Sequence, residues 1–394
     1  MLFTFFSGEG FLFDCVIVRF GELTLKSERV RRKFLDILRR NIFQVLEGLD
    51  FQIREERGRF FVDTGSIADV SSRLSKIFGI VSVSPAARIR ADLGVIADFC
   101  VKVAKIHDFS GKSFAVRVVK RLGKHDFSSM DLANVVGERI LNAVPDARVD
   151  LGNPDFEVFI EVRDDDAYVF TEKVDGLGGL PLGSEGRLVS LFSGGIDSPV
   201  AAFLMMKRGC FCNLLYVDNS PFTDESTFKR ALETAKVLKQ YAPKLRLYVV
   251  KHGENLENFI KNAPRWFTCI LCKRLMYKVA EKVCLKTGAR GIVTGESIGQ
   301  VASQTLDNLL AINQATTLPI LRPLIGLDKR EIEDIARKIG TYEPSHKRVT
   351  GCSAFPSGPA LNAKLDEILK VEEKLCIEKT IEEAFKTLQE IEIP

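Results

Sequence analysis

The sequence lacks a long apolar run. No uninterrupted stretch reaches the roughly 18 apolar residues that a membrane-spanning helix needs. Residues 1–18 come closest, but Glu9, Asp14 and two glycines interrupt them. This stretch also lacks the basic start and the small-residue cleavage site of a signal peptide. We therefore expect neither a membrane segment nor a signal peptide.

A large excess of one charge is absent too, as are internal repeats and low-complexity tracts. The 394 residues include 56 basic and 52 acidic ones, and the net charge of +4 is too small to indicate a partner. Hydrophobic residues make up 46% and charged residues 27%, which is ordinary for a globular protein and excludes a disordered or collagen-like chain. A chain of this length exceeds one compact core, so we expect two or three domains.

The cysteines do not form the pattern of a secreted, disulfide-rich protein. There are nine of them, an odd number, and they are spread over the whole length. We therefore expect a reducing, cytoplasmic compartment. Six cysteines lie in apolar stretches and are expected to be small buried side chains. These are Cys15, Cys100, Cys210, Cys212, Cys284 and Cys376.

Basic residues cluster in the first third of the chain. Between Lys26 and Arg40 there are seven basic residues and two acidic ones, and between Lys102 and Lys124 there are seven basic residues and one acidic one. A solvated helix face or a charged strand would account for either cluster alone. Two clusters in one part of a nearly neutral chain favour a surface that binds a polyanion.

The hydrophobic periodicity predicts three successive regions. Residues 14–77 have the strand-helix-strand-strand-helix order of a small ferredoxin-like α+β unit. Residues 80–175 predict a second α/β unit, and the glycine-rich stretch at 175–186 predicts a linker. Beyond it, short apolar strands alternate with helices, which is typical of a doubly wound parallel sheet with ligands at the carboxyl ends of its strands. The residues after Cys352 predict one or two closing helices.

The string LFSGGIDSP at 191–199 is the most informative motif, and we call residues 192–198 the phosphate loop. It lies between an apolar strand and a helix, where free amides favour bound anionic oxygens. The glycines let the backbone approach a ligand, and the two serines add hydroxyl groups. No Gly-Lys-Ser/Thr follows, so this is not a Walker A loop. Glycines alone would suit a plain tight turn, but the Asp and Ser at these offsets favour nucleotide binding.

The motif resembles the loop of PP-loop ATP pyrophosphatases, which bind the pyrophosphate of ATP and activate a carbonyl oxygen by adenylation. Further segments, in the same order, resemble the tRNA 4-thiouridine synthetase family. They are RFGELTLKSERVRRKF near the start, LGNPD at 151–155, GLGGLPLG at 176–183, CKRLMYKVAEKV at 272–283, TGESIGQVASQTLDNL at 294–309 and ILRPLIGLDKREI at 320–332.

The resemblance implies three domains and an activity. The domains would be a ferredoxin-like α+β domain at 1–75, a THUMP α/β RNA-binding domain at 76–175, and a PP-loop domain of the adenine nucleotide alpha hydrolase-like type at 176–394. The activity would be ATP-dependent replacement of the 4-oxygen of uridine 8 in tRNA by sulfur. The resemblance also implies Mg²⁺ with the ATP, tRNA as partner, and a homodimer.

The resemblance further implies which residues bind ATP. They are Leu191, Phe192, Ser193, Gly194, Gly195, Asp197, Ser198, Tyr216, Val217, Lys273, Gly295 and Gln304. Asp197 would hold magnesium or orient the phosphates, and we count it as catalytic. A cationic Lys273 facing phosphate is chemically reasonable.

Three other cysteines carry the sulfur chemistry in this interpretation. Cys269 and Cys272 form a C-x-x-C pair at the start of a predicted helix, and Cys352 follows far downstream. Only 42 residues come after Cys352, too few for the rhodanese-like domain that carries a persulfide in some family members. The chain therefore resembles the rhodanese-lacking type, whose members include proteins with three cysteines around an iron–sulfur cluster.

The identity of the group at these cysteines stays open. An iron–sulfur cluster, [4Fe-4S] or [3Fe-4S], would take Cys269, Cys272 and Cys352 as ligands, with Cys352 also catalytic. A persulfide or disulfide at Cys352 is one alternative, and a zinc site with His346 is another. The sulfur would come from sulfide or a cysteine desulfurase. Trp266, just before the pair, could stack on a base, but we expect it to pack in the core.

Two other functions remain open at this point. Sulfur supply for the thiamin thiazole, a role also linked to the family, would need the cysteines but not the basic clusters. A non-catalytic RNA-binding module with a relic ATP loop would need the basic clusters alone, but it would be free to lose the serines and the aspartate of the phosphate loop.

Overall fold

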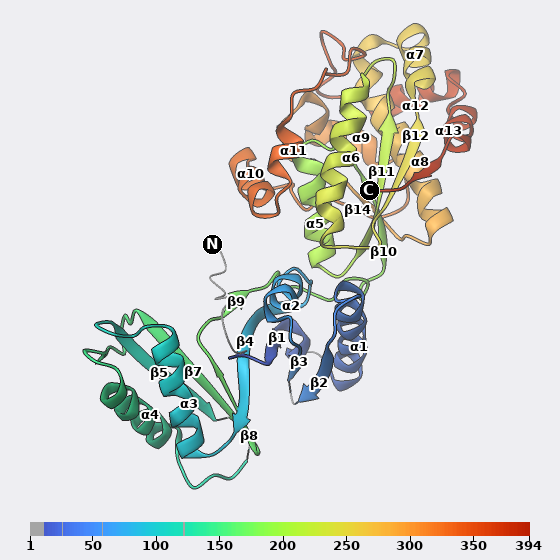
Figure 1. Ribbon diagram of the computed structural model, residues 1–394. Coiled ribbons are helices and arrows are strands. Elements are labelled where there is room, and N and C mark those ends of the chain that lie inside the picture. Colours follow the sequence, from blue (N-terminus) through green and yellow to red (C-terminus); the bar gives the residue numbers. More distant parts are fainter. Residues whose placement is uncertain (1–11, 26, 57, 121–122) are drawn as a thin grey trace. The chain divides into compact units, whose positions relative to one another are not determined.

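The computed structural model describes residues 12–25, 27–56, 58–120 and 123–394 (Figure 1). Residues 1–11, Lys26 and Arg121, which entered the predictions above, lie outside the described residues. Contacts divide the chain into an N-terminal unit, residues 1–179, and a C-terminal unit, residues 180–394. Each unit is described by itself.

The N-terminal unit is built on one nine-stranded sheet with the order β2-β3-β1-β4-β8-β7-β5-β6, in which β9 also pairs with β4. The strands are β1 (Cys15–Phe20), β2 (Gln52–Glu56), β3 (Arg59–Asp63), β4 (Ile80–Arg90), β5 (Ser113–Lys120), β6 (Arg148–Val149), β7 (Phe156–Arg163), β8 (Asp166–Phe170) and β9 (Val174–Asp175). The helices are η1 (Glu22–Leu25), α1 (Glu28–Val45), α2 (Ile67–Leu74), α3 (Leu93–Ile106) and α4 (Ser129–Ala143). The predicted strand-helix-strand-strand-helix order of the first region is confirmed.

The long strand β4 belongs to both halves of this unit. Its first part pairs antiparallel with β1, and its last part, Ala87–Arg90, pairs antiparallel with β8. The second half has its own core, in which α3 and α4 pack on β5, β7 and β8 around Phe114, Val136 and Ile160. The ferredoxin-like and THUMP-like halves therefore share a sheet, although each has its own helices.

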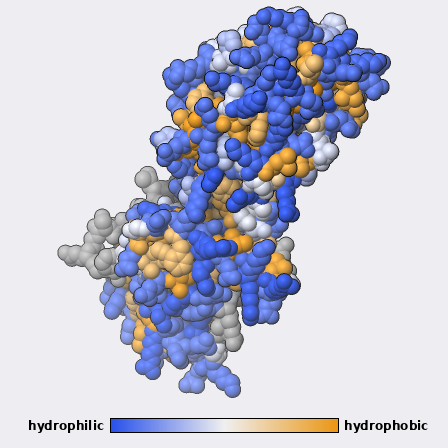
Figure 2. Space-filling view, turned by 90° about the vertical axis from the view of Figure 1, so that its right-hand side faces the viewer, coloured by the Kyte–Doolittle hydropathy of each residue, from blue (hydrophilic) through white to orange (hydrophobic). Residues whose placement is uncertain are grey.

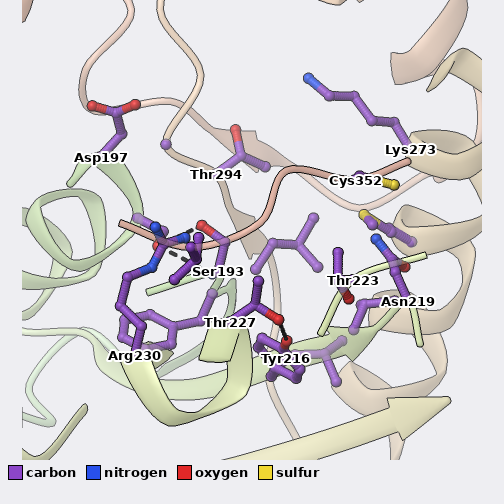
Figure 3. A pocket seen from close by; sticks show the side chains of 18 of the residues that line it. Ser193, Asp197, Tyr216, Asn219, Thr223, Thr227, Arg230, Lys273, Thr294 and Cys352 are labelled. Atoms are coloured by element: carbon purple, nitrogen blue, oxygen red, sulfur yellow. Dashed lines mark hydrogen bonds between the residues drawn. The ribbon is translucent and has the colours of Figure 1, made fainter. Parts of the chain in front are cut away.

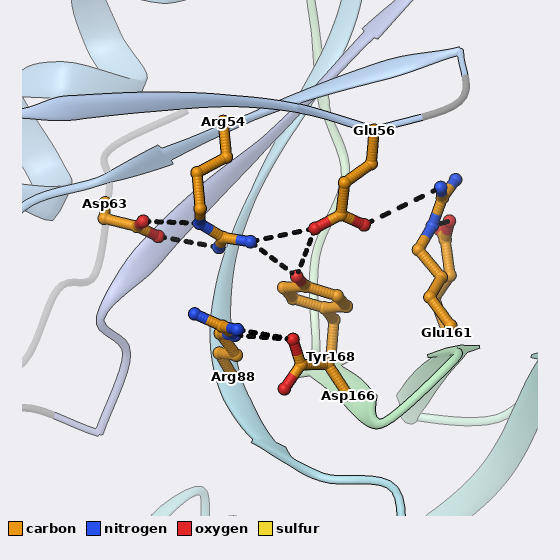
Figure 4. Close-up of polar contacts among 8 residues, drawn as sticks. Arg54, Glu56, Asp63, Arg88, Glu161, Asp166 and Tyr168 are labelled. Atoms are coloured by element: carbon orange, nitrogen blue, oxygen red, sulfur yellow. Dashed lines mark hydrogen bonds and ion pairs between the residues drawn. The ribbon is translucent and has the colours of Figure 1, made fainter.

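A polar network also joins the two halves (Figure 4). Arg54 on β2 donates to both carboxylate oxygens of Asp63 at 2.6 and 2.9 Å, and to the hydroxyl of Tyr168 on β8 at 3.0 Å. Arg59 on β3 donates to the buried Glu161 on β7 at 2.7 Å. The Arg54–Tyr168 and Arg59–Glu161 bonds connect the two halves, and the Arg59–Glu161 pair is largely shielded from water.

The basic clusters take different forms in the structure. In the first, five basic side chains lie on the exposed surface of α1: Arg29, Arg31, Arg32, Lys33 and Arg40. The second is divided between α3, with Lys102 and Lys105, and β5, where Arg117 pairs with Glu157 at 2.8 Å. The first cluster thus forms one helical surface, and the second does not.

The C-terminal unit contains a six-stranded sheet with the order β14-β13-β10-β11-β12-β15. The strands are β10 (Arg187–Leu191), β11 (Phe211–Asp218), β12 (Arg246–Lys251), β13 (Ile292–Val293), β14 (Ile320–Leu321) and β15 (Gln389–Ile391). All neighbours pair in parallel except β15, which runs antiparallel to β12. The predicted parallel sheet is confirmed, with an antiparallel strand added at one edge.

Helices cover both faces of this sheet (Figure 1). They are α5 (Asp197–Lys207), α6 (Glu225–Lys239), α7 (Gly253–Asn262), η2 (Arg265–Phe267), α8 (Thr268–Thr287), η3 (Ala302–Gln304), α9 (Leu306–Asn313), α10 (Lys329–Lys338), α11 (Tyr342–His346), α12 (Leu365–Lys374) and α13 (Ile377–Lys386). The main core surrounds α8, whose Leu271, Leu275 and Val279 are fully buried. This packing fixes the helix that begins beside the C-x-x-C pair.

Two predictions near the end of the chain need correction. The closing helices α12 and α13 form as expected, but Gln389–Ile391, which was predicted to be helical, is the edge strand β15. Its pairing with β12 satisfies backbone groups that an open edge would leave unpaired. Cys376 is exposed rather than buried, because it forms the turn between α12 and α13 with a φ of +51°.

The surface gives no sign of a membrane-spanning helix. Among the residues described, none of the helices is both long and apolar enough to cross a bilayer. The face in Figure 2 is largely hydrophilic, and its hydrophobic residues lie in small groups.

Candidate active site

The phosphate loop has the geometry of an anion-binding turn. It connects the end of β10 at Leu191 to the start of α5 at Asp197. Gly194 has a φ of +70°, and a Cβ placed on it would lie 2.3 Å from the Cα of Ala231 on α6. Only glycine lets the loop lie this close to α6. The loop therefore leads directly into the amino end of α5, where the first backbone amides of a helix are available to an anion, as the sequence predicted.

Two serines and a second glycine shape this loop. The N–H of Ser193 donates to Oγ of Ser198 at 3.1 Å, and the N–H of Gly195 donates to Oγ of Ser193 at 3.3 Å. At Gly295, a Cβ would lie 2.9 Å from the backbone N of Ser198. Gly295 thus lets the segment after β13 pass directly against the start of α5, which is a structural reason for a glycine that sequence alone left unremarkable.

A cavity of about 380 Å³ opens beside the loop at the carboxyl ends of β10 and β11 (Figure 3). Its volume is within the range of small-molecule sites. Nine of the twelve residues predicted for ATP line it: Leu191, Phe192, Ser193, Asp197, Ser198, Tyr216, Val217, Lys273 and Gly295. Gly194 and Gly195 belong to the loop without lining the cavity. Gln304 does not line it either; it is buried in η3.

Asp197 is paired with a lysine that the sequence analysis did not single out. Lys329, the first residue of α10, donates from Nζ to Oδ1 of Asp197 at 2.8 Å. The preceding Asp328 caps α10 in a capping box with Glu331, and the Asp-x-x-Glu spacing of the sequence favours such a cap. This cap explains why Lys329 is held at a helix start that faces the phosphate loop. Lys329 lies in the string LDKREI, but the pattern of this string indicates only a helix cap and gives Lys329 no role at the site.

Lys273 lies at the cavity, but its partner is a carboxylate. Its Nζ donates to Oε1 of the buried Glu296 at 2.8 Å. Oε2 of Glu296 accepts from Arg322 and from the hydroxyl of Tyr277, both at 2.7 Å, and from Thr294 at 3.0 Å. Burial alone would raise the pKa of Glu296, but Lys273 and Arg322 outweigh it and lower this pKa to about 2. Glu296 therefore stays ionised and fixes where Lys273 points.

Cys352 lies at the opposite end of the cavity from the phosphate loop, and the C-x-x-C pair lies on the helix α8. Cys352 lines the cavity, and Cys269 and Cys272 lie in the first turns of α8. Burial raises the pKa of the Cys272 thiol, and the nearby Cys269 and Cys352 raise it further. Cys352 packs against the core cluster that contains Cys272, so the structure brings together two cysteines that lie 80 positions apart in the sequence.

The segment that carries Cys352 is tied to the loop after β11. The N–H of Ser353 donates to the carbonyl of Phe222 at 2.9 Å, and the hydroxyl of Thr350 donates to Asp224, the N-cap of α6. These bonds place residues 349–352 along the cavity wall. Trp266 is 53% exposed, so the prediction that it packs in the core is wrong.

Several cavity residues were missed by sequence reasoning. They are Asn219, Thr223, Thr227, Arg230, Met276, Tyr277 and Glu296. Most lie in the segment 219–230, which the sequence showed only as a turn followed by an amphipathic helix. No sequence motif identifies a side chain on a helix that lines a cavity built mainly by other helices and strands.

Comparisons with known proteins agree with this geometry. Three family models match successive parts of the chain: a ThiI ferredoxin-like domain over residues 15–84, a THUMP domain over 90–172, and a model described as thiamine biosynthesis protein (ThiI) over 183–377. A probable tRNA sulfurtransferase of Methanosarcina mazei is 42% identical over 395 residues, which cover 96% of each chain. One from Methanosarcina acetivorans is also 42% identical, covering 95% of this chain and 93% of that one.

The chain belongs to the tRNA sulfurtransferase (ThiI) family.

A solved structure supports the same conclusion at the level of the fold. A 4-thiouridine synthetase crystallised with RNA and bound ATP is 34% identical, with a TM-score of 0.88, and the match covers 96% of this chain and 100% of that one. The predicted fold class of a ThiI protein, with ferredoxin-like, THUMP and PP-loop regions, is therefore confirmed.

The three cysteines of this ThiI protein offer only sulfur ligands, so the group that they could hold depends on what else lies near them. Within the described part of the chain, no three Cys, His, Asp or Glu side chains are arranged to hold a metal ion. His346 stacks instead on the ring of Tyr342, so the zinc alternative gains no support. Thiols are the ligand type that iron–sulfur clusters take, and Cys352 is the one that lines the cavity.

Proposed function

We propose that this protein is an ATP-dependent tRNA sulfurtransferase that replaces the 4-oxygen of uridine 8 in tRNA by sulfur and so forms 4-thiouridine. The observation that carries the proposal is a single cavity with the phosphate loop at one end and Cys352 at the other. An exchange of oxygen for sulfur needs both a group that activates the oxygen and a group that delivers the sulfur. The related 4-thiouridine synthetase, which binds RNA and ATP, supports this assignment.

Activation is the task of the phosphate-loop end. The 4-oxygen of uridine belongs to an amide-like carbonyl and is a poor leaving group, whereas its adenylate leaves as AMP. The loop amides and the hydroxyls of Ser193 and Ser198 would bind the phosphates that depart as pyrophosphate. Mg²⁺ bound with the ATP would neutralise phosphate charge, and Asp197 would be its carboxylate ligand. The Lys329 ion pair keeps Asp197 in place at the loop.

Sulfur delivery is the task of Cys269, Cys272 and Cys352. An iron–sulfur cluster of the [4Fe-4S] type held by their thiolates would leave one iron without a protein ligand, and the chemistry it would supply is delivery of sulfide to the activated base. The protein would hold Cys352 in place through the hydrogen bonds that connect Thr350 and Ser353 to the loop after β11. A persulfide on Cys352 is the alternative. Iron and sulfide analysis of the anaerobically purified protein separates the two, because only a cluster requires about three or four irons per chain.

The N-terminal unit would bind the tRNA, mainly through the exposed basic surface of α1 and the THUMP-like half. A homodimer and a cytoplasmic location are part of the same proposal. Nine cysteines without a disulfide in the structure are consistent with a reducing compartment. The sulfur donor would be sulfide or a cysteine desulfurase.

The decisive experiment analyses nucleosides by mass spectrometry. Unmodified tRNA is incubated anaerobically with the protein, ATP, Mg²⁺ and sulfide, then digested. We expect 4-thiouridine at position 8 with the wild type, and none with Asp197→Asn, while tRNA binding by this variant stays near the wild-type level. Wild-type protein that binds ATP and tRNA but leaves uridine 8 unchanged would refute the proposal.

Sulfur supply for the thiamin thiazole is a second candidate, favoured by the description of the family model that matches residues 183–377. It would use the cysteines without the basic surface of α1. Replacing Arg31 and Arg32 by Glu should therefore abolish tRNA thiolation and leave a thiazole-forming reaction unaffected. Complementation of a thiamin auxotroph by this variant measures the second role separately.

A further inference from the structure

Arg230 is a cation beside the phosphate loop to which neither a sequence motif nor the family match gives a role. It extends from α6, lines the cavity and lies next to Ser193 (Figure 3). Its Nη2 would be 3.8 Å from a Cβ placed on Gly195, so the guanidinium lies directly beside the loop backbone. The next residue, Ala231, is the one packed against Gly194. The contact that fixes the loop on α6 therefore also fixes Arg230.

Arg230 has no counter-charge among the described residues. Its Nε is buried without a hydrogen-bond partner. Burial lowers the pKa of its guanidinium, and no carboxylate is among the groups that act on it. The adjacent Lys229, in contrast, is exposed and pairs with Glu225 at 3.1 Å. A cation that is partly withdrawn from water and unpaired costs free energy, which an anion in the cavity would recover.

The other charged groups of the cavity already have partners. Lys273 is paired with Glu296, and Asp197 is paired with Lys329. An anion bound at the loop would therefore contact the amides at the amino end of α5 on one side and the unpaired guanidinium of Arg230 on the other. A planar guanidinium suits phosphate oxygens because it can donate two parallel hydrogen bonds.

We propose that Arg230 binds the β- and γ-phosphates of ATP and stabilises the pyrophosphate as it leaves. The inference rests on the proposed adenylation. In that step, the uridine 4-oxygen bonds to the α-phosphorus, and the bond from the α-phosphorus to the bridging oxygen breaks. The bridging oxygen leaves on pyrophosphate with the electron pair of that bond, and the N3 proton of uridine is lost to solvent. Arg230 faces the group on which negative charge accumulates, so its contribution is larger in the transition state than in bound ATP.

The test compares Arg230→Ala and Arg230→Lys with the matched control Lys229→Ala. Binding of pyrophosphate and of AMP to each intact protein is measured by calorimetry, without tRNA. We expect Arg230→Ala to weaken pyrophosphate binding at least tenfold and to leave AMP binding within twofold, because AMP has no β-phosphate. Arg230→Lys should recover part of the loss, and Lys229→Ala should match the wild type.

Thermal unfolding of the same variants excludes a merely structural role. Removing an unpaired, partly buried cation should leave the melting temperature without ligand unchanged or raised, whereas loss of a structural contact would lower it. Arg230→Ala should also reduce the rate of pyrophosphate release in the tRNA-dependent reaction more than it raises the KM for ATP.

The outcomes separate this inference from the proposed function. Equal pyrophosphate binding by Arg230→Ala and the wild type would overturn the inference, as would an equal loss of pyrophosphate and AMP binding. If the wild type binds pyrophosphate in an Arg230-dependent way but forms no 4-thiouridine, the role of Arg230 in binding stands and the proposed reaction fails.

Discussion

At the scale of single residues, Glu296 shows how a carboxylate can decide what a neighbouring cation does. Its two oxygens accept hydrogen bonds from Lys273, Arg322, Tyr277 and Thr294. Two cations around one buried carboxylate leave the group with a net positive charge at the cavity wall. Lys273 is thus held at the cavity wall by Glu296, and Arg322 keeps this carboxylate paired if Lys273 turns toward a bound anion.

We predict that Glu296→Gln destabilises the protein at pH 7 by about 3 kcal/mol, because it leaves two cations without their carboxylate in a buried place. The folded pKa of about 2 lies below the ordinary value of 4.5, so the wild-type stabilisation is complete above about pH 4.5 and is lost as the pH falls toward 2. The stability difference between the two proteins should therefore narrow between pH 5 and pH 3.

Urea unfolding at a series of pH values measures this difference. Glu257→Gln is the control, since its exposed ion pair with Lys261 should contribute less than about 1 kcal/mol. The KM for ATP of Glu296→Gln should rise several-fold, as Lys273 loses its fixed orientation. A stability difference that stays constant down to pH 3 would contradict the assigned role of the Glu296 carboxylate.

At the scale of elements, a buried ion pair connects α8 to its neighbours in addition to the apolar core around it. Arg274 is 1% exposed and donates to both oxygens of Glu372 on α12, at 2.7 and 2.8 Å, and to the carbonyl of Ala311 on α9. It connects three helices that are far apart in sequence. Because α8 begins beside the C-x-x-C pair, this connection also fixes the position of Cys269 and Cys272.

Breaking this pair should be costly. Glu372→Ala is expected to destabilise the C-terminal unit by about 3–5 kcal/mol, because Arg274 remains buried without its counter-charge. The double variant Arg274→Met with Glu372→Leu should be clearly more stable than Glu372→Ala, since it removes both charges. Thermal unfolding of the intact protein measures both. Equal destabilisation by the two variants would show that side-chain volume, not charge, is what α12 requires.

At the scale of the whole molecule, the division of the chain into two units matches the division of tasks that we propose. The N-terminal unit has its own core between α3, α4 and the sheet, and the C-terminal unit has its own core around α8. The candidate active site is lined entirely by residues of the C-terminal unit. A unit with its own core can fold independently.

We therefore predict that residues 1–179 and 180–394, produced as separate fragments, each unfold cooperatively. The N-terminal fragment should bind tRNA with a marked dependence on salt, because its contacts are to phosphate. The C-terminal fragment should bind ATP with an affinity within a few-fold of that of the intact chain. Circular dichroism, a tRNA gel shift and calorimetry test these expectations, and neither fragment alone should thiolate tRNA. ATP binding that requires residues 1–179 would argue against the division.

The sequence by itself determined the order of elements, the parallel sheet and the position of the phosphate loop. These follow from local causes: alternating apolar residues, glycines at a strand-to-helix turn, and the capping box before α10. For the same reason, most residues predicted for ATP do line the cavity, since all but Lys273 lie at or just beyond the carboxyl ends of neighbouring strands.

Only the tertiary structure decided which distant side chains meet. Arg230 beside the loop, Lys329 on Asp197 and Glu296 beneath Lys273 come from separate elements whose local pattern predicts only amphipathic helices or turns. The same holds for Gln389–Ile391, whose pairing partner β12 lies over 130 positions earlier in the chain. Local sequence fixes which backbone conformation a segment prefers, whereas charge neighbours and strand partners depend on packing between segments that the sequence keeps apart.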